Sequence, residues 1–311
     1  MEFSFGPVPS RRLGRSLGIN NIVPKTCTYS CVYCQLGKTL DLTSKRRMFY
    51  DPSEIVISIK KRVQELREKN IRIDYLTFVP DGEPTLDINI GKEIQALRDL
   101  GIKIAVITNS SLIWDEDVRN SLYNADFVSL KIDTVRNDIW KKLNVPFRDL
   151  DLNEILSGIK IFSKNYHGIL ATETMLVKDI NDRDFDETAL FIGELKTSIS
   201  YISVPTRPPA YDFVKIPDER SILDAYETFK KFIDNVETLT DFEGEEFVTL
   251  ENTLGDIMNI ISVHPIREDV LRKILIDKGI YWEDLEMLIK KGLIKKENYL
   301  GYNYYVKKIK N

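Results

Sequence analysis

The sequence predicts an α/β fold built on a mainly parallel sheet, followed by a small helical domain. Between residue 15 and about residue 235, short apolar segments alternate with amphipathic segments of helical period, and this alternation is typical of parallel α/β architectures. Six of the apolar segments have the length of a strand, which predicts six parallel strands. After residue 235 the pattern changes to helices and a hairpin, so we expect two domains, 1–235 and 236–311.

The expected elements follow one another with short connections. A first strand near 17–22 precedes a loop that holds every cysteine. Asp51 and Pro52 mark the start of a helix that runs to about residue 70, because aspartate caps a helix and proline fits its first turn. The other expected strands are 73–79, 102–108, 126–132, 169–177 and 200–204. The other expected helices are 88–100, 115–123, 135–143, 151–164, 184–196 and 217–234.

The C-terminal segment predicts a winged-helix domain. An acidic connector that contains glycine, 241–246, leads to helical patterns at 253–262, 266–278 and 281–291, and a hairpin follows over 292–306. The lysines and tyrosines of the hairpin suit a wing that contacts phosphates, whereas Glu283, Asp284 and Glu286 on the third helix oppose such contacts. The pattern therefore leaves both nucleic acid and protein open as partners.

The composition indicates a globular protein of the cytoplasm. Of the 311 residues, 43% are hydrophobic and 30% charged, which is ordinary for a globular chain. The sequence contains no run of eighteen apolar residues and no charged-then-apolar leader, so we expect no membrane association and no secretion. The net charge of −4 argues against broad, nonspecific binding of nucleic acid.

All three cysteines lie within eight positions, as Cys27, Cys31 and Cys34 in a C-x3-C-x2-C pattern. Three thiolates at this spacing can bind three irons of a cubane cluster and leave the fourth iron open to a second molecule. A structural zinc site is the main alternative, but it needs a fourth ligand, and His167 and His264 are distant in sequence. The odd count argues against a disulfide framework.

A second motif lies about forty residues after the cysteine loop. The apolar strand that ends at Val79 runs directly into Pro80-Asp81-Gly82-Glu83-Pro84-Thr85. A glycine in such a turn lets the backbone approach a ligand closely, and a proline fixes the turn. Alone, this Gly-Glu-Pro sequence would be an ordinary turn from a strand into a loop.

With these two motifs the chain resembles the radical S-adenosylmethionine (SAM) superfamily. The resemblance implies a partial (β/α)6 TIM-like barrel, and a [4Fe–4S] cluster bound by Cys27, Cys31 and Cys34. It also implies that SAM binds the open iron and is cleaved to a 5′-deoxyadenosyl radical, which abstracts hydrogen from a substrate. An electron donor of the ferredoxin or flavodoxin type would reduce the cluster. In this resemblance Tyr33 packs near SAM, and the backbone of Gly82, Glu83 and Pro84 meets its amino group.

Within the superfamily, residues 6–18 and the Asp-Gly-Glu-Pro-Thr-Leu segment are most similar to the wyosine-synthase-like group, whose name comes from enzymes that build a tricyclic base in transfer RNA. The cysteines that bind a second cluster in those enzymes are absent, since this chain has no cysteine outside 27–34. The resemblance implies a macromolecular substrate, with RNA modification as the first hypothesis. Modification of a protein or peptide, including activation of a glycyl-radical enzyme, is the alternative, and an iron–sulfur regulator that binds DNA is a third.

Polar residues at the ends of the expected strands are candidate SAM ligands. The resemblance implies that Lys131 pairs with the SAM carboxylate, and that Asn109, Ser129 or Asp133 binds the ribose hydroxyls. The alternative is structural: Asn109 would help to cap the next helix, and Lys131 would pair with an acid in the core.

Arginines flank the expected mouth of the barrel. Arg11 and Arg12 precede the cysteine loop, and Arg207 lies in a loop stiffened by three prolines. We expect these side chains to bind an anionic group of the substrate, such as a carboxylate or phosphate. Ion pairs within the protein, or for Arg207 a plain surface position, are the alternatives.

Overall fold

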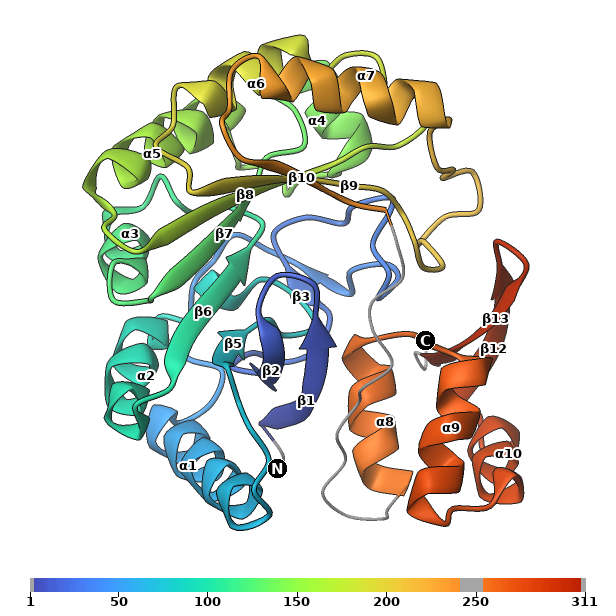
Figure 1. Cartoon of the computed structure of the whole chain (residues 1–311). Coiled ribbons are helices and arrows are strands. Elements are labelled where there is room, and N and C mark those ends of the chain that lie inside the picture. The colour runs from blue at the N-terminus through green and yellow to red at the C-terminus, as the bar shows by residue number, and fades with distance from the viewer. Residues whose placement is uncertain (1–2, 241–253, 309–311) are drawn as a thin grey trace.

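The structure, a computed structural model, describes residues 3–240 and 254–308. Within them the central sheet has eight strands, in the order β1-β2-β5-β6-β7-β8-β9-β10 (Figure 1). These strands are β1 (Ser4–Ser10), β2 (Gly14–Ile19), β5 (Tyr75–Phe78), β6 (Lys103–Thr108), β7 (Phe127–Lys131), β8 (Ile169–Met175), β9 (Ile199–Ser203) and β10 (Val236–Leu239). Only the β1–β2 pair is antiparallel, so the sheet is mostly parallel, as predicted, and consistent with a partial barrel.

Helices cover the outer face of this sheet (Figure 1). They are α1 (Pro52–Glu68), α2 (Ile90–Leu97), α3 (Glu116–Leu122), α4 (Asn137–Leu143), α5 (Leu152–Asn165), α6 (Asp186–Gly193) and α7 (Glu219–Lys230), with short 3-10 turns η1 (Pro84–Leu86) and η2 (Arg98–Leu100). Asp51 caps α1 as expected, because its carboxylate accepts the Ser53 N–H at 2.8 Å.

Successive side chains along the strands point alternately into the hydrophobic core and into a cavity on the other face of the sheet. On β5, Leu76 and Phe78 are fully buried in the main core, whereas Thr77 lines a cavity on the other face. On β7, Leu130 lies in the same core and Ser129 lines the cavity. Since successive side chains of a strand point to opposite faces, every second residue of these strands is available for a binding site.

The prediction of six strands missed two. Strand β1 was not expected, because Gly6-Pro7-Val8-Pro9 contains two prolines, which are confined to edge strands and bulges. It pairs with β2 at the edge of the sheet. Strand β10 lies beyond residue 235, where the second domain was expected to begin, and pairs in parallel with β9.

The C-terminal module, residues 254–308, contains three helices and a small sheet. Its elements are α8 (Leu254–Val263), β11 (Ile266–Arg267), α9 (Glu268–Lys278), α10 (Trp282–Lys290), β12 (Ile294–Tyr299) and β13 (Tyr302–Lys307), and its sheet has the order β11-β13-β12. The helix expected from residue 266 begins at Glu268, because the two residues before it form β11. The expected connector 241–246 lies outside the described residues.

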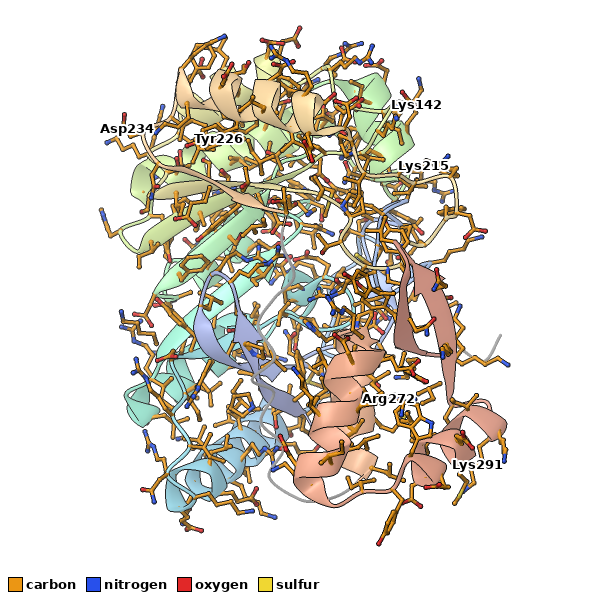
Figure 2. All side chains as sticks on the ribbon, turned by 45° about the vertical axis from the view of Figure 1, so that its right-hand side comes forward. Lys142, Lys215, Tyr226, Asp234, Arg272 and Lys291 are labelled. Carbon is orange, nitrogen blue, oxygen red and sulfur yellow. The ribbon has the colours of Figure 1, made fainter. Side chains whose placement is uncertain are left out.

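The C-terminal module packs against the N-terminal hairpin of the sheet. Phe5 and Val8 of β1 belong to the same apolar cluster as Ile257 and Ile261 of α8, and Figure 2 shows side chains filling this space. Among the described residues, no helix combines the length and the apolar character needed to cross a membrane.

A buried pair of carboxyl groups makes the stability of the fold sensitive to pH. Asp87 and Glu93 are both fully buried. Burial raises the pKa of Glu93 to about 9, and the negative charge of Asp87 contributes to this rise. The folded chain therefore keeps a proton that the unfolded chain loses at about pH 4.5, so stability falls as the pH rises between these values.

The Glu93→Gln variant is expected to remove most of this dependence, because an amide of the same shape needs no bound proton. Urea unfolding at several pH values between about 5 and 9 measures the slope. Glu227→Gln, an exposed glutamate on α7, is the matched control and should keep the wild-type slope. If the stability of Glu93→Gln falls with rising pH as steeply as that of the wild type, the dependence does not come from Glu93.

Candidate functional site

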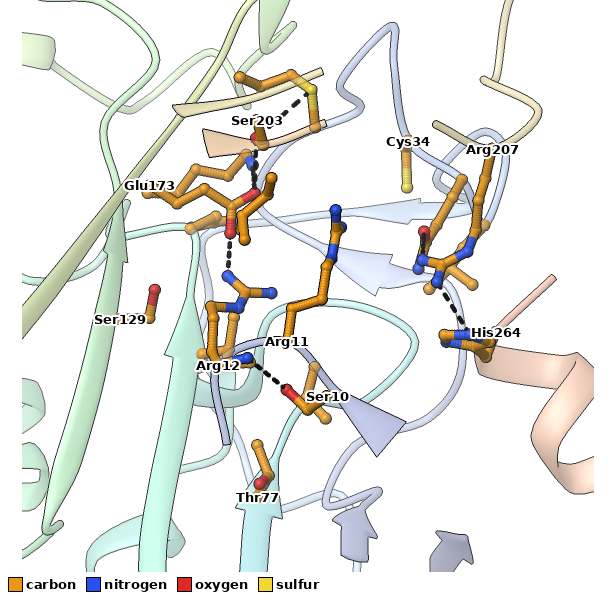
Figure 3. A pocket seen from close by; sticks show the side chains of 18 of the residues that line it. Ser10, Arg11, Arg12, Cys34, Thr77, Ser129, Glu173, Ser203, Arg207 and His264 are labelled. Atoms are coloured by element: carbon orange, nitrogen blue, oxygen red, sulfur yellow. Dashed lines mark hydrogen bonds and ion pairs between the residues drawn. The ribbon is translucent and has the colours of Figure 1, made fainter. Parts of the chain in front are cut away.

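A cavity of about 340 Å³ opens where the parallel strands end (Figure 3). Each of five neighbouring strands contributes at least one polar side chain to its wall, among them Thr77, Thr108, Ser129, Glu173 and Ser203. In open parallel sheets, binding sites form outside the carboxyl ends of the strands. The volume lies at the lower end of the range for small-molecule sites.

All three cysteines line this cavity. Cys27 lies on the short strand β3 (Thr26–Cys27), which pairs with β4 (Asp41–Leu42), and Cys31 and Cys34 follow in the loop. The loop is anchored to the end of α4, since Val32 donates its N–H to the Leu143 carbonyl at 2.9 Å. The three cysteines that the sequence assigns to one site thus line the same cavity.

The donor set fits an iron–sulfur cluster. Burial is the main cause that raises the pKa of all three thiols, to about 12 for Cys31. Metal binding must then displace protons from them. Among residues 3–240 and 254–308, no three His, Cys, Asp or Glu side chains converge on one point as a single metal ion requires. A cubane cluster needs no such convergence, because each thiolate binds a different iron.

The Asp81–Pro84 segment fastens the cysteine strand to the sheet. Gly82 forms a β-bridge with Thr26, the residue before Cys27. Its φ is +148°, and a Cβ atom there would lie 1.9 Å from the Thr26 carbonyl oxygen, so only glycine fits. Asp81 forms a buried ion pair with Lys25 at 3.3 Å. The sequence predicts that Gly82 approaches a ligand closely, and the structure shows a close approach to the strand that carries Cys27.

Glu83 is a buried hydrogen-bond acceptor at the centre of this junction. Its carboxylate accepts the Thr85 N–H at 3.1 Å, the Thr85 hydroxyl at 2.6 Å, the Thr108 hydroxyl at 2.7 Å and the Asn109 N–H at 2.7 Å. The side chain is committed to these groups, while Glu83 as a residue still lines the cavity. Pro84 opens the turn η1 and is not among the lining residues.

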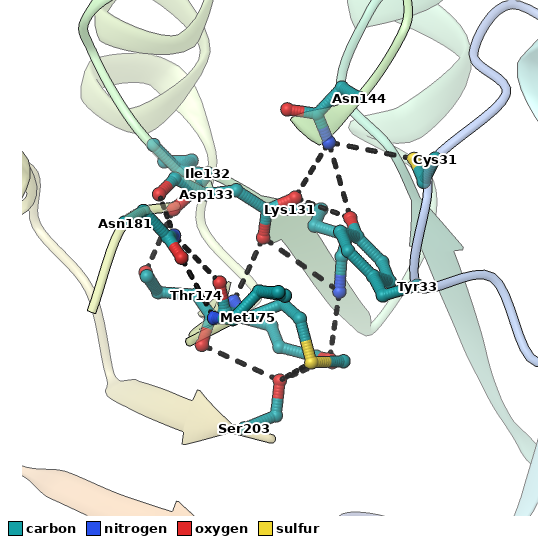
Figure 4. A network of polar contacts seen from close by, with 12 residues as sticks. Cys31, Tyr33, Lys131, Ile132, Asp133, Asn144, Thr174, Met175, Asn181 and Ser203 are labelled. Atoms are coloured by element: carbon teal, nitrogen blue, oxygen red, sulfur yellow. Dashed lines mark hydrogen bonds and ion pairs between the residues drawn. The ribbon is translucent and has the colours of Figure 1, made fainter. Parts of the chain in front are cut away.

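The strand-end candidates are brought together, with several of their side chains already paired. Ser129 and Lys131 line the cavity. Lys131 donates to Glu173 at 3.0 Å and lies 4.0 Å from Asp133. Its geometry therefore matches the alternative in which this lysine pairs with an acid of the protein. Asp133 is buried and accepts hydrogen bonds from Tyr33 and from the Met175 backbone (Figure 4).

Two asparagines contact the cysteine sulfurs. Asn109 donates to Cys27 Sγ at 3.5 Å and to the Thr28 hydroxyl at 2.7 Å. Asn144 donates to Cys31 Sγ at 3.5 Å and to Asp133 at 2.7 Å. Asn144 was missed from the sequence, because it lies 113 residues after Cys31 and resembles an ordinary residue at the end of a helix.

The arginines surround the same cavity (Figure 3). Arg11 and Arg12 lie in the β1–β2 turn, and Arg12 forms an ion pair with Glu173. Although burial opposes it, the charges of Arg12 and Lys131 hold the pKa of Glu173 far below its ordinary value. Arg207 is buried and donates to Gln35, the residue after Cys34, at 2.7 Å.

The C-terminal module completes the cavity wall, which the sequence did not predict. His264, at the end of α8, lines the cavity and lies 2.9 Å from the Arg207 guanidinium. The hydroxyls of Tyr299 and Tyr304 donate to the carbonyls of Pro205 and Thr206 at 2.8 and 3.1 Å. The module is therefore tied to the loop that carries Arg207.

Fold and site together define a parallel α/β protein with a three-cysteine centre at the carboxyl ends of its strands. Residues 21–192 match the model of the radical SAM superfamily. The UPF0026 protein MJ1312 of Methanocaldococcus jannaschii is 46% identical over the whole chain and 98% of its own length. The UPF0026 protein slr1464 of Synechocystis is 32% identical over 66% of this chain and 76% of its own length.

Solved structures with the same fold are distant in sequence. A radical SAM methyltransferase from Sphaerobacter thermophilus superposes with a TM-score of 0.55 at 14% identity, over 72% of this chain and 66% of its own. SuiB of Streptococcus suis, bound to S-adenosylmethionine, gives 0.52 at 15% identity, over 70% of this chain and 49% of its own. The chain belongs to the radical SAM superfamily and, within it, to the UPF0026 proteins.

Proposed function

We propose that this protein is a radical SAM enzyme whose cluster is bound by Cys27, Cys31 and Cys34 and whose SAM site is the adjoining cavity. The observation that carries the proposal is that the three thiols and the polar ends of five strands line one cavity. When bound, the reduced cluster and SAM supply the one-electron chemistry that ends in hydrogen abstraction from a substrate. A sensing role for the cysteines alone would leave this cavity without a purpose.

The residues of the chain would bind and orient SAM. We assign Ser129 to the ribose, because this residue brings a hydroxyl group to the wall of the cavity. Lys131 is held by Glu173 beside the ring of Tyr33, 5.0 Å from the ring centre. It would share its charge between Glu173 and the SAM carboxylate. The Gly82–Pro84 backbone lies next to Cys27, which suits the proposed contact with the SAM amino group.

The substrate is proposed to be a macromolecule that the C-terminal module presents. The order of three helices and three short strands supports a winged-helix fold for this module. Its contribution of His264 to the cavity wall supports a role in catalysis. Exposed Lys291 suits RNA, the first hypothesis, whereas the ion pairs of Lys295 with Glu297 and of Lys296 with Glu268 reduce the positive charge. A protein or peptide substrate is the second.

The cationic cavity supports an anionic group on that substrate. Arg11, Arg12 and Arg207 all line it, together with Lys131. Single electrons would come from a ferredoxin- or flavodoxin-type protein, and an oxygen-sensitive cluster would require a reducing interior such as the cytoplasm.

Formation of 5′-deoxyadenosine tests the proposal. The protein is reconstituted anaerobically with iron and sulfide, reduced with dithionite and given SAM, and the product is measured by chromatography. Wild-type protein is expected to form 5′-deoxyadenosine only with dithionite, and Cys34→Ala to form none. RNA that co-purifies with the protein would favour RNA modification, and one tightly associated protein would favour the alternative. A wild-type protein that holds zinc and ignores SAM would refute the proposal.

A further inference from the structure

Two side-chain amides, one at the end of a strand and one at the end of a helix, point at two of the three cysteine sulfurs. Asn109 follows β6, and its Nδ2 lies 3.5 Å from Cys27 Sγ. Asn144 follows α4, and its Nδ2 lies 3.5 Å from Cys31 Sγ (Figure 4). Both distances are within the range of N–H···S hydrogen bonds, which are longer than those to oxygen because sulfur is larger.

The surroundings of each amide determine which end faces the sulfur. The Asn109 Oδ1 accepts the Ser111 N–H at 3.0 Å, so its NH₂ group must point the other way, toward Thr28 and Cys27. The Asn144 NH₂ group faces the Asp133 carboxylate at 2.7 Å, and the flipped amide would place two oxygens against each other. Both asparagines are therefore donors to sulfur.

Such donors matter more for a thiolate bound to iron than for a free thiol. A cluster gains one negative charge when it is reduced, and that charge is spread over its sulfurs. Hydrogen bonds to the sulfurs stabilise the reduced state more than the oxidised state and raise the reduction potential. The buried Asp133 accepts a hydrogen bond from the same Asn144 Nδ2 that donates to Cys31, and its negative charge has the opposite electrostatic effect on the cluster.

We propose that Asn109 and Asn144 are positioning residues that raise the midpoint potential of the cluster bound by Cys27, Cys31 and Cys34. The proposal rests on the proposed function. It gives these two side chains a role toward the cluster, acting through Cys27 and Cys31. Since the two amides contact different sulfurs, their effects should add.

The test is an EPR-monitored redox titration of the reconstituted full-length protein without SAM. Asn109→Ala and Asn144→Ala are each expected to lower the midpoint potential, by about 59 mV for every tenfold loss of electron affinity. The double variant is expected to show the sum of the two shifts. Asn235→Ala is the matched control, because its amide donates to the Ser198 carbonyl at the opposite end of the strands, and it should keep the wild-type potential.

Serine variants guard against a failure to bind iron. Asn109→Ser and Asn144→Ser keep the sites polar but are too short to reach the sulfurs, and the same downward shift is expected. A full complement of iron with an unchanged potential in all these variants would overturn the inference and leave the proposed function intact. A wild-type protein that binds no cluster at all would overturn both.

Discussion

Glu83→Ala is expected to destabilise the fold strongly and to prevent the cysteine loop from holding iron. The Glu83 carboxylate is buried and accepts four hydrogen bonds, from Thr85, Thr108 and Asn109. Alanine would leave these donors without their acceptor at a buried position, at about 1–3 kcal/mol for each unmet group. These hydrogen bonds hold Glu83 at the junction between β5, β6 and the strand that carries Cys27, so the substitution weakens that junction.

Urea unfolding of the apoprotein and iron content after reconstitution measure the two effects. Glu227→Ala removes an exposed glutamate of α7 and should change neither quantity. Glu83→Gln should be intermediate, since one amide oxygen still accepts while the NH₂ group opposes a donor. Wild-type stability in Glu83→Ala would show that these hydrogen bonds are not needed for the fold.

Much of the site could be predicted because its signals are local in sequence. The spacing of Cys27, Cys31 and Cys34 places three thiols in one loop, and Gly82 with Pro84 marks a turn after an apolar strand. The periodicity of the strands also placed Ser129 and Lys131 at the same end of the sheet as the cysteines. These features require no knowledge of how distant segments pair.

The remaining features depend on contacts between distant segments. Strand β1 carries prolines that lower its strand propensity, and it forms because it pairs with β2 and is covered by α8. His264 reaches the cavity only because the C-terminal module folds back on the strands, 57 residues after Arg207. A residue such as Asn144 carries no motif, and its contact with Cys31 is visible only in three dimensions.

Glu173→Ala is expected to have the second large effect, because Glu173 is the shared anion of two cations. It pairs with Arg12 and lies 3.0 Å from Lys131, and it also accepts from the Ser203 hydroxyl at 3.0 Å. Alanine would remove the carboxylate that these two cations share in a largely buried site, which costs about 3–5 kcal/mol. The pKa of Glu173 is depressed, so its contribution is complete above about pH 4.5, its unfolded value, and is lost as the pH falls below it.

Urea unfolding at neutral pH measures the loss, and the surface pair of Lys160 and Glu194 provides the matched control. These side chains are 2.6 Å apart and about half exposed, so Glu194→Ala should cost less than about 1 kcal/mol. Added phosphate should partly restore the stability of Glu173→Ala and not of Glu194→Ala, because an anion can replace the lost carboxylate between Arg12 and Lys131. Equal losses of unfolding free energy in Glu173→Ala and Glu194→Ala would mean that the buried ion pairs of Glu173 stabilise the fold no more than a surface pair. If phosphate changes the stability of Glu173→Ala no more than that of the wild type, the two cations do not form an anion site that faces the cavity.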